Sequence, residues 1–260
     1  MTKPQCVILA GGRGTRIGEE SHLRPKPMIE IGGRPVLWHI MKFYACFGVE
    51  EFIVCLGYRG YVIKEYFFNY YLHSSDVTFD LASNAVHYHE TRSEPWKVTL
   101  VDTGEATQTG GRLRRVRPYL REGSPFFMTY GDGLSDIDID GQLEFHRAHG
   151  RLATMTVVQP PARFGRATLD GERIVEFGEK AHTGTTSING GYFVLAPGAL
   201  DGVEGDGTIW ERQPLERLAD TDQLRAWRHE GFWQPMDTMR ERDVLEGLWG
   251  GDKAPWKLWA

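Results

Sequence analysis

The sequence predicts an α/β fold built on a mainly parallel sheet. Its first apolar run, Cys6–Leu9, is short, continuous and ended by glycines, as is typical of a buried parallel strand. Apolar residues then recur at helical spacing from Val36 to Tyr44, and a second apolar run, 51–56, follows Gly48. A strand, a helix and a strand in this order form a right-handed crossover, which places the two strands parallel in one sheet.

The composition fits one ordinary globular domain. The 260 residues are 41% hydrophobic and 25% charged, which suits a sizeable core and argues against disorder. The net charge of -5 argues against a nucleic-acid partner, which an excess of basic residues would attract. No apolar run approaches the ~18 residues of a membrane span, and no signal region precedes the first strand, so we expect a cytoplasmic protein without membrane contact. The three cysteines lack metal-ligand spacing, and we expect buried, reduced thiols.

The elements expected after 51–56 continue the alternation of helices and strands. Gly32 and Gly33 make a turn that would place Pro35 at the first position of the helix after it. The other expected elements are helices at about 61–72, 113–120, 142–149, 208–219 and 239–249, strands at 77–79, 85–89, 98–101, 126–130, 152–158, 188–195 and 224–228, and a hairpin at 166–177 that turns at Asp170-Gly171. We expect the tryptophan-rich tail after 249 to dock on the body or on another subunit.

A glycine-rich basic loop follows the first strand and is typical of a polyphosphate site. Gly11, Gly12 and Gly14 let backbone N–H groups approach a ligand closely, and Arg13, Arg16, Arg24 and Lys26 add positive charge. Pro25 and Pro27 restrict the backbone on both sides of Lys26, which makes it a fixed charge. The loop lacks the Lys-Ser or Lys-Thr of a P-loop, and Ile17 stands where a dinucleotide fingerprint needs its third glycine.

Other polar motifs leave both a structural and a functional interpretation open. Asp132 lies between two glycines at the carboxyl end of the 126–130 strand, on the same sheet edge as the glycine loop, so it is a metal candidate or a turn aspartate. The loop 103–112 ends in Gly111 and Arg112 and is either a ligand loop or a simple turn. The histidine pairs at 87 and 89 and at 146 and 149 have no third ligand nearby, which disfavours metal sites.

Several of these motifs together resemble the sugar-1-phosphate nucleotidyltransferases. Leu9 to Arg16 followed by Pro25-Lys26-Pro27-Met28 is similar to the signature of that family. Further segments are similar to one branch, the glucose-1-phosphate cytidylyltransferases, and they lie at 32–41, 57–66, 94–104, 109–112, 130–133, 188–191 and 232–238. The resemblance covers nearly the whole chain. It implies a Rossmann-like three-layer domain over 1–260, with a mainly parallel mixed sheet and small β-hairpin and C-terminal helical additions.

The resemblance also implies roles for particular residues. It divides the chain into a nucleotide-binding half at about 1–135, a sugar-binding half at about 136–240, and a C-terminal helix and tail at about 239–260. It makes Arg16, Lys26 and Asp132 catalytic, and Asp132 and Asp237 the ligands of Mg²⁺. The nucleotide-binding residues are then Leu9, Ala10, Gly11, Gly12, Arg13, Gly14, Thr15, Arg16, Lys26, Thr107, Gly111, Arg112 and Gly131. The sugar-phosphate residues are Tyr130, Glu179, Lys180, Asn189 and Gly190, although Ala181 stands where the family commonly has proline.

The implied reaction joins CTP and α-D-glucose 1-phosphate to give CDP-glucose and pyrophosphate, a supply step for CDP-linked deoxysugars of surface polysaccharide. A phosphate oxygen is already an anionic nucleophile, so positioned cations and a divalent metal matter more than a general base. The alternatives are a thymidylyl- or uridylyltransferase acting on a hexose 1-phosphate, and a non-catalytic sugar-nucleotide sensor. The resemblance further implies a homo-oligomer, for which the aromatic helix at 61–72 and the tail are candidate interfaces.

Overall fold

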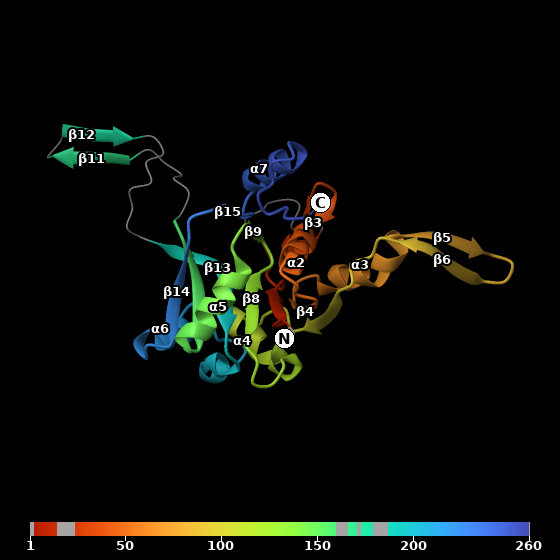
Figure 1. The fold of residues 1–260 in the computed structure, drawn as a ribbon, viewed down its shortest axis with the longest axis horizontal. Helices are drawn as coiled ribbons and strands as arrows, with labels where there is room; N and C mark the ends of the chain where they lie inside the picture. Colours follow the sequence, from red (N-terminus) through yellow and green to blue (C-terminus); the bar gives the residue numbers. More distant parts are fainter. Residues whose placement is uncertain (1–2, 15–23, 160–165, 171–172, 179–186, 260) are drawn as a thin grey trace.

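The computed structural model describes residues 3–14, 24–159, 166–170, 173–178 and 187–259, and its centre is a seven-stranded sheet (Figure 1). The strand order is β14-β10-β13-β8-β1-β4-β7. Neighbouring strands run parallel except β13, which is antiparallel to both β10 and β8. The strands are β1 (Cys6–Leu9), β4 (Glu51–Leu56), β7 (Lys97–Asp102), β8 (Phe126–Tyr130), β10 (Ala153–Val158), β13 (Ile188–Leu195) and β14 (Leu224–His229). The predicted mainly parallel mixed sheet is therefore confirmed.

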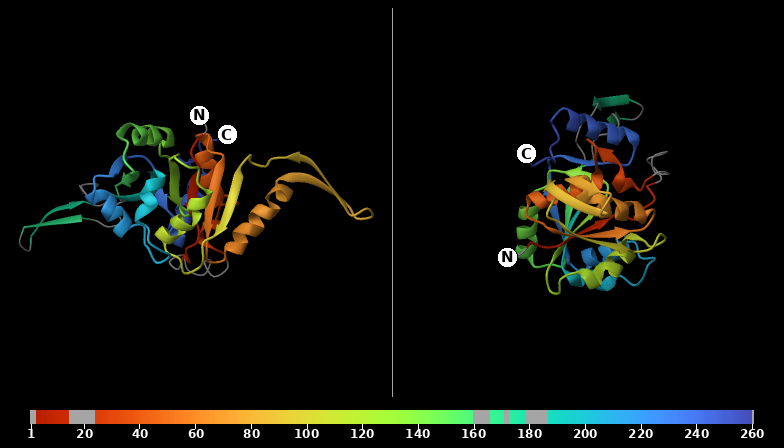
Figure 2. Two further views of the ribbon diagram at one scale, coloured as in Figure 1. Left: turned by 90° about the horizontal axis from the view of Figure 1, so that it is seen from below. Right: turned by 90° about the vertical axis from the view of Figure 1, so that its right-hand side faces the viewer.

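Helices cover both faces of this sheet, so the fold has three layers (Figure 2). Cys6 and Ile8 of β1 face one apolar core and Val7 and Leu9 face the other, as the alternation of side chains along a strand requires. The first core packs against α2 (Val36–Cys46), α5 (Ile139–His149) and α7 (Met239–Gly250), and the second against α4 (Thr109–Val116), α6 (Gln213–Asp220) and the 3₁₀ helix Pro197–Gly202. No helix in the described part of the chain is both long and apolar enough to span a bilayer.

In the described part of the chain, four two-stranded ribbons and two further 3₁₀ helices accompany the sheet. The ribbons are β2 (Glu30–Ile31) with β3 (Arg34–Pro35), β5 (Ser75–Asp80) with β6 (Ala85–Thr91), β9 (Gly133–Ser135) with β15 (Trp233–Pro235), and β11 (Arg166–Asp170) with β12 (Arg173–Gly178). The 3₁₀ helices are Lys26–Met28 and Arg117–Tyr119. The helix α3 (Gly60–His73) leads into the β5–β6 ribbon, which extends away from the sheet (Figures 1 and 2). The predicted hairpin at 166–177 is present as β11–β12.

Two helices begin at other residues than the sequence prediction gives, for different reasons. The helix α4 begins at Thr109 and not at 113, so its glycines are helical. Segment 206–208 lies against them: the backbone N–H of Gly111 donates to the carbonyl of Thr208 at 3.1 Å. The helix α6 begins only at Gln213 and not at 208, with Pro214 in its first turn. Proline favours such an N-terminal position because its missing N–H has no intrahelical partner there.

Two further expectations about single residues were wrong. Pro35 is the N-cap of α2 with ψ 145°, and not its first helical residue, because it still pairs with Glu30 in the β2–β3 ribbon. Cys46 is exposed, whereas Cys6 and Cys55 are buried as expected. Cys46 is the last residue of α2 and lies one turn after Lys42, which is only partly buried, so this side of the helix end meets solvent.

The C-terminal tail docks on the body through a cluster of aromatic rings around His39. Trp256 is fully buried, and its Nε1 donates to His39 Nδ1 at 3.3 Å. His39 Nε2 lies 2.8 Å from the carbonyl oxygen of Ile31, so this nitrogen carries the proton and donates. The rings of Trp249 and Trp259 also contact the imidazole, with centroids 4.8 and 6.2 Å away. Docking of the tail was expected, and the structure confirms it.

We predict that His39 makes the protein less stable at acid pH. Burial lowers the pKa of His39 to about 4 from its ordinary 6.5. Above about pH 6.5 the ring is neutral in both the folded and the unfolded chain. Between about pH 6.5 and 4 only the unfolded chain takes up the proton. The free energy of unfolding therefore falls as the pH falls through this range. The contribution of this one group reaches at most about 3 kcal/mol.

The measurement is chemical denaturation of the unmodified protein and of His39→Gln between pH 7.5 and 4. A glutamine keeps a donor and an acceptor but does not titrate, so the stability of the variant should fall less steeply across this range. Parallel curves for the two proteins would contradict the assignment.

Candidate active site

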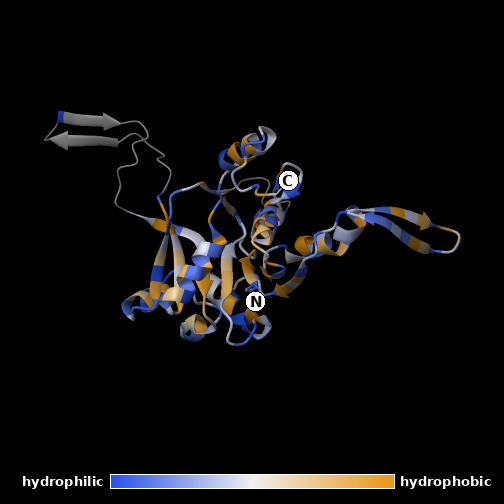
Figure 3. Ribbon diagram, viewed as in Figure 1, coloured by the Kyte–Doolittle hydropathy of each residue, from blue (hydrophilic) through white to orange (hydrophobic). Residues whose placement is uncertain are grey.

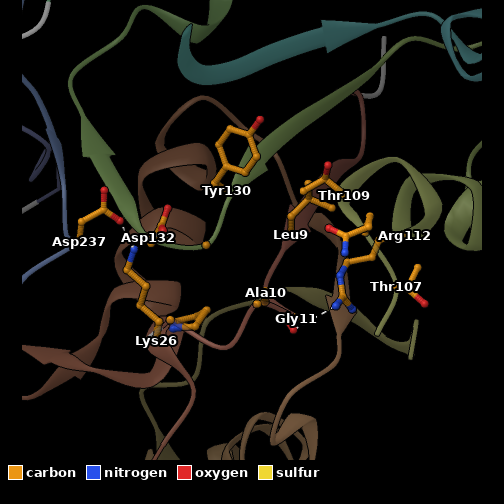
Figure 4. Close-up of a pocket in the computed structure, with 15 residues that line it drawn as sticks. Leu9, Ala10, Gly11, Lys26, Thr107, Thr109, Arg112, Tyr130, Asp132 and Asp237 are labelled. Atoms are coloured by element: carbon orange, nitrogen blue, oxygen red, sulfur yellow. Dashed lines mark hydrogen bonds and ion pairs between the residues drawn. The ribbon is translucent and has the colours of Figure 1, made fainter. Parts of the chain in front are cut away.

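A cavity of about 330 Å³ lies at the carboxyl ends of β1 and β8 (Figure 4). The two strands pair in register from Cys6 with Phe127 to Leu9 with Tyr130, so the residues after each strand lie together at one sheet edge. Open α/β sheets bind ligands at such an edge. Of the predicted site residues, the cavity is lined by Leu9, Ala10, Gly11, Gly12, Gly14, Lys26, Thr107, Arg112, Tyr130, Gly131, Asp132 and Asp237.

Lys26 joins the two aspartates that the family resemblance pairs. Its ammonium nitrogen lies 2.5 Å from Asp132 Oδ2 and 2.6 Å from Asp237 Oδ1. The ribbon β9–β15 makes this meeting possible: Pro235 pairs with Gly133, and the N–H of Met236 donates to the carbonyl of Asp132 at 2.8 Å. The strand that follows Asp132 therefore holds the segment that ends in Asp237, 105 residues further along the chain.

The two carboxylates keep Lys26 charged. The side chain is 10% exposed, and burial alone lowers the pKa of Lys26, but the charges and hydrogen bonds of Asp132 and Asp237 outweigh this and leave the pKa above its ordinary value. The ammonium also shows that both carboxylates can reach one cation. Mg²⁺ commonly takes one or two protein carboxylates and completes its shell with water and substrate phosphates, so this pair fits it. The described residues hold no cluster of three or more acidic, histidine or cysteine ligands.

Arg112 lies at the opposite end of the cavity, with its guanidinium turned toward the backbone (Figure 4). Nη1 donates to the carbonyls of Leu56 and Gly104, each at 2.9 Å, and to Thr103 Oγ1 at 2.7 Å. Nη2 donates to the carbonyl of Gly11 at 3.1 Å. The guanidinium of Arg112 thus connects three chain segments around the cavity. The sequence did not predict this role. Burial lowers the pKa of Arg112 from its ordinary value.

Close packing explains two glycines of the predicted nucleotide site. A Cβ atom on Gly11 would lie 2.1 Å from Nη1 of Arg112, and one on Gly111 would lie 2.5 Å from the carbonyl oxygen of Asp206. Each position therefore leaves no room for a side chain. Gly11 lines the cavity, whereas Gly111 packs against the 206–208 segment.

The remaining predicted site residues do not line the cavity or cannot be placed. Arg13 is exposed and pairs with Glu105 at 2.7 Å. Asn189 lies beside the cavity wall, where its Nδ2 donates to the hydroxyl of Tyr130 at 3.4 Å, and Gly190 accepts a hydrogen bond from Trp233 Nε1 at its carbonyl. Four predicted residues, Thr15, Arg16, Glu179 and Lys180, lie outside the described residues.

Sequence reasoning missed three residues at this site. Pro27, Gln108 and Thr109 also line the cavity. The position of Gln108 and Thr109 directly after the predicted Thr107 was a usable signal. Both lie within the 103–112 loop, in which the resemblance assigns Thr107, Gly111 and Arg112 to the nucleotide, and Pro27 directly follows the predicted Lys26.

Comparisons with known proteins decide the family. A model of the nucleotidyl transferase family matches residues 5–213. The chain belongs to this family. Glucose-1-phosphate cytidylyltransferase of Salmonella typhi is 54% identical over 255 residues, covering 98% of this chain and 99% of that protein. A probable glucose-1-phosphate cytidylyltransferase of Bacillus subtilis is 39% identical and covers 98% and 100%. The family resemblance seen in the sequence motifs is thus confirmed.

Solved structures of distant relatives show the same fold as this nucleotidyl transferase. HddC from Yersinia pseudotuberculosis superposes with a TM-score of 0.70 at 23% identity, covering 95% of this chain and all of that chain. A putative glucose-1-phosphate thymidylyltransferase from Bacillus anthracis gives 0.68 at 16% identity and covers 95% of each chain. These likenesses confirm the three-layer fold of this family member.

For this transferase we predict that Arg112→Lys costs about 2 kcal/mol of unfolding free energy, because lysine has fewer donors, lacks the planar fork, and leaves buried carbonyls without partners. Chemical denaturation measures the loss. Arg114→Lys, an exposed change on the same helix, is the matched control and should shift stability by less than about 0.5 kcal/mol. Equal losses of unfolding free energy in the two variants would contradict the role of Arg112 in holding the loops together.

Proposed function

We propose that this chain transfers a cytidylyl group from CTP to α-D-glucose 1-phosphate, forming CDP-glucose and pyrophosphate. The observation that carries the proposal is the meeting of Lys26, Asp132 and Asp237 in a cavity bordered by the glycine loop. Near full-length identity of 54% to a glucose-1-phosphate cytidylyltransferase supports the choice of substrates. A cytoplasmic location agrees with this function, since CTP is a cytoplasmic metabolite.

In the proposed reaction an oxygen of the sugar phosphate attacks the α-phosphorus of CTP in line with the leaving pyrophosphate. The nucleophile is already anionic, so the protein's task is to bring two polyanions together and to stabilise charge that shifts to the leaving group. We assign that role to Lys26, which is buried and charged, and to Arg16, which lies outside the described residues. A divalent metal ion held by Asp132 and Asp237 would add positive charge at the same phosphates.

The two halves of the chain would bind different substrates. Residues of the first half, about 1–135, supply the glycine loop and Thr107, and we assign them to the nucleotide. Residues of about 136–240 include Asn189, which contacts Tyr130, and we assign them to the sugar phosphate. The C-terminal segment, about 239–260, contributes the helix that follows Asp237 and the docked tail. We treat all three as parts of one nucleotidyltransferase domain.

We predict that CTP with glucose 1-phosphate is the pair turned over fastest. The test measures pyrophosphate release for CTP, UTP, dTTP and GTP against several hexose 1-phosphates. Faster turnover of UTP or dTTP would replace the proposal with a uridylyl- or thymidylyltransferase. Nucleotide binding without pyrophosphate release in any combination would favour a non-catalytic sugar-nucleotide sensor.

We predict that Asp132→Asn and Asp237→Asn each lower kcat by about a hundredfold or more, as losses of transition-state charge stabilisation do. Mn²⁺ paramagnetic resonance gives a readout apart from turnover, because each variant should bind Mn²⁺ more weakly than the unmodified protein. Since the ammonium of Lys26 occupies the position between the two carboxylates, Mn²⁺ should bind more tightly when CTP is present to draw the lysine to its phosphates.

Asp243→Asn is the matched control for these two variants, because Asp243 is largely exposed on α7. It should leave both turnover and Mn²⁺ affinity unchanged. Chelation by EDTA should abolish turnover, and added Mg²⁺ should restore it. Full turnover in EDTA, or unchanged Mn²⁺ affinity in both site variants, would refute the metal assignment.

We further propose that the chain forms a homo-oligomer through α3 and the β5–β6 ribbon. Figure 3 shows apolar positions along α3 and near the tip of the ribbon, where Phe68 is 88% and Leu81 is 90% exposed. Of α3 only Ile63 is fully buried, whereas Val62, Tyr66 and Phe67 pack partly against the first core, so much of this aromatic helix is left exposed. Exposed apolar patches often mark protein–protein contacts. The docked tail, by contrast, already has a partner in the body.

We predict that Phe68→Glu lowers the mass of the assembly in sedimentation velocity, because a carboxylate at a contact would lose its hydration. The matched control is Val244→Glu, which places the same charge at a half-exposed apolar position on α7. A monomeric unmodified protein, or equal dissociation in both variants, would contradict this interface.

A further inference from the structure

Glu211 connects two walls of the cavity through a single carboxylate. Thr109 Oγ1 donates to Glu211 Oε2 at 2.5 Å, and the hydroxyl of Tyr130 donates to Glu211 Oε1. The three residues come from distant parts of the chain: Thr109 is the first residue of α4, Tyr130 is the last residue of β8, and Glu211 lies just before α6. The two hydroxyls bind different oxygens of one carboxylate, so Glu211 sets the separation of α4 and β8 at these residues.

Both donors lie next to residues on which the proposed reaction depends. Thr109 lines the cavity two residues after Thr107, on the side assigned to the nucleotide. Tyr130 lines the cavity two residues before Asp132, on the side of the two aspartates (Figure 4). A fixed separation between Thr109 and Tyr130 therefore also fixes the separation between the cavity wall with Thr107 and Thr109, here called the nucleotide wall, and the pair Asp132 and Asp237.

The surrounding hydrogen bonds leave each hydroxyl only one way to turn. The N–H of Trp210 donates to Thr109 Oγ1 at 2.9 Å, and Asn189 Nδ2 donates to the hydroxyl of Tyr130 at 3.4 Å. Each hydroxyl thus accepts one bond and gives its only proton to Glu211.

The segment that carries Glu211 is itself attached to the start of α4. The N–H of Gln108 donates to the carbonyl of Asp206 at 2.8 Å, and the N–H of Gly111 donates to the carbonyl of Thr208 at 3.1 Å. Trp210, directly before Glu211, is fully buried in the second core. The carboxylate is therefore placed by the backbone and the core, and not by the substrate.

We propose that Glu211 is a positioning residue, which holds Thr109 and Tyr130 together and so sets the nucleotide wall at a working distance from Asp132 and Asp237. This inference rests on the proposed function and adds a residue to it. Glu211 acts through its two partners. A small misplacement of substrate relative to charged groups is enough to slow a transfer reaction, since the in-line geometry must be met.

The isosteric variant Glu211→Gln tests the role directly. A carboxylate accepts from both hydroxyls, whereas an amide has one acceptor oxygen and one NH₂ group, so one hydroxyl must release its present bond and turn its proton elsewhere. We expect kcat to fall by about 10- to 100-fold with smaller changes in KM, because positions and not substrate contacts are altered. Glu216→Gln, exposed on α6, is the matched control and should keep the activity of the unmodified protein.

A double-mutant cycle with Tyr130→Phe separates positioning from a general loss of stability. If Glu211 acts through Tyr130, the kcat loss of the double variant should be close to the larger single loss and well below the product of the two. Losses that multiply, or a Glu211→Gln variant with unchanged kcat, would overturn the proposal. Thermal unfolding of every variant ensures that kinetics are compared on folded protein. If Glu211→Gln does not fold, the Thr109→Val and Tyr130→Phe cycle replaces it, with the same non-additivity expected and the same outcome against it.

The proposed function can fail separately from this inference. If the unmodified protein does not turn over CTP with glucose 1-phosphate, the cycle is measured with whichever nucleoside triphosphate and hexose 1-phosphate do release pyrophosphate. If no pair releases pyrophosphate, both the proposed function and the positioning role of Glu211 are wrong. Normal turnover of CTP with multiplicative losses would overturn the role of Glu211 alone.

Discussion

The site depends on one buried ammonium held between two carboxylates. Lys26 lies within 2.6 Å of both Asp132 and Asp237, and these residues come from three separate parts of the chain. Desolvating one lysine would favour its neutral form, but two nearby carboxylates reverse that preference. The local structure around the site brings these three residues into contact: the 3₁₀ helix positions Lys26, and the β9–β15 ribbon brings the two aspartates together.

Arg112, the second buried cation of the cavity, has a different role. Arg112 donates to backbone carbonyls at the ends of β1 and β4 and in the loop after β7, and none of its hydrogen bonds in the described part of the chain goes to a carboxylate. A guanidinium with five donors in a plane can satisfy several carbonyls at once, which an ammonium cannot. Lys26 thus contacts the two aspartates, whereas Arg112 holds the loops together.

Much of the fold and part of the site could be predicted because their signals are local. Apolar runs and helical spacing identified the strands β1, β4 and β8 and the helix α2, and the glycine loop and Asp132 followed from residues directly after strands. The start of α4 could not be predicted, because the 206–208 segment, nearly a hundred residues away in the chain, packs against Gly111. The start of α6 follows a local signal that the prediction did not use, which is Pro214 in its first turn. The exposure of Cys46 was missed for a related reason: propensity does not tell which side of a helix end meets solvent.

The family, the parallel sheet and the sheet edge that carries the cavity could be inferred from the sequence alone, since each rests on short motifs or on the period of apolar residues. The tertiary structure alone decided how those residues are used. It turned Arg112 from a presumed ligand contact toward the backbone, brought Lys26 between the two aspartates, and revealed Glu211 behind Thr109 and Tyr130. The physical reason is that a hydrogen bond or ion pair forms only where two groups meet at the right distance and angle, and long-range packing sets that geometry for residues far apart in the chain.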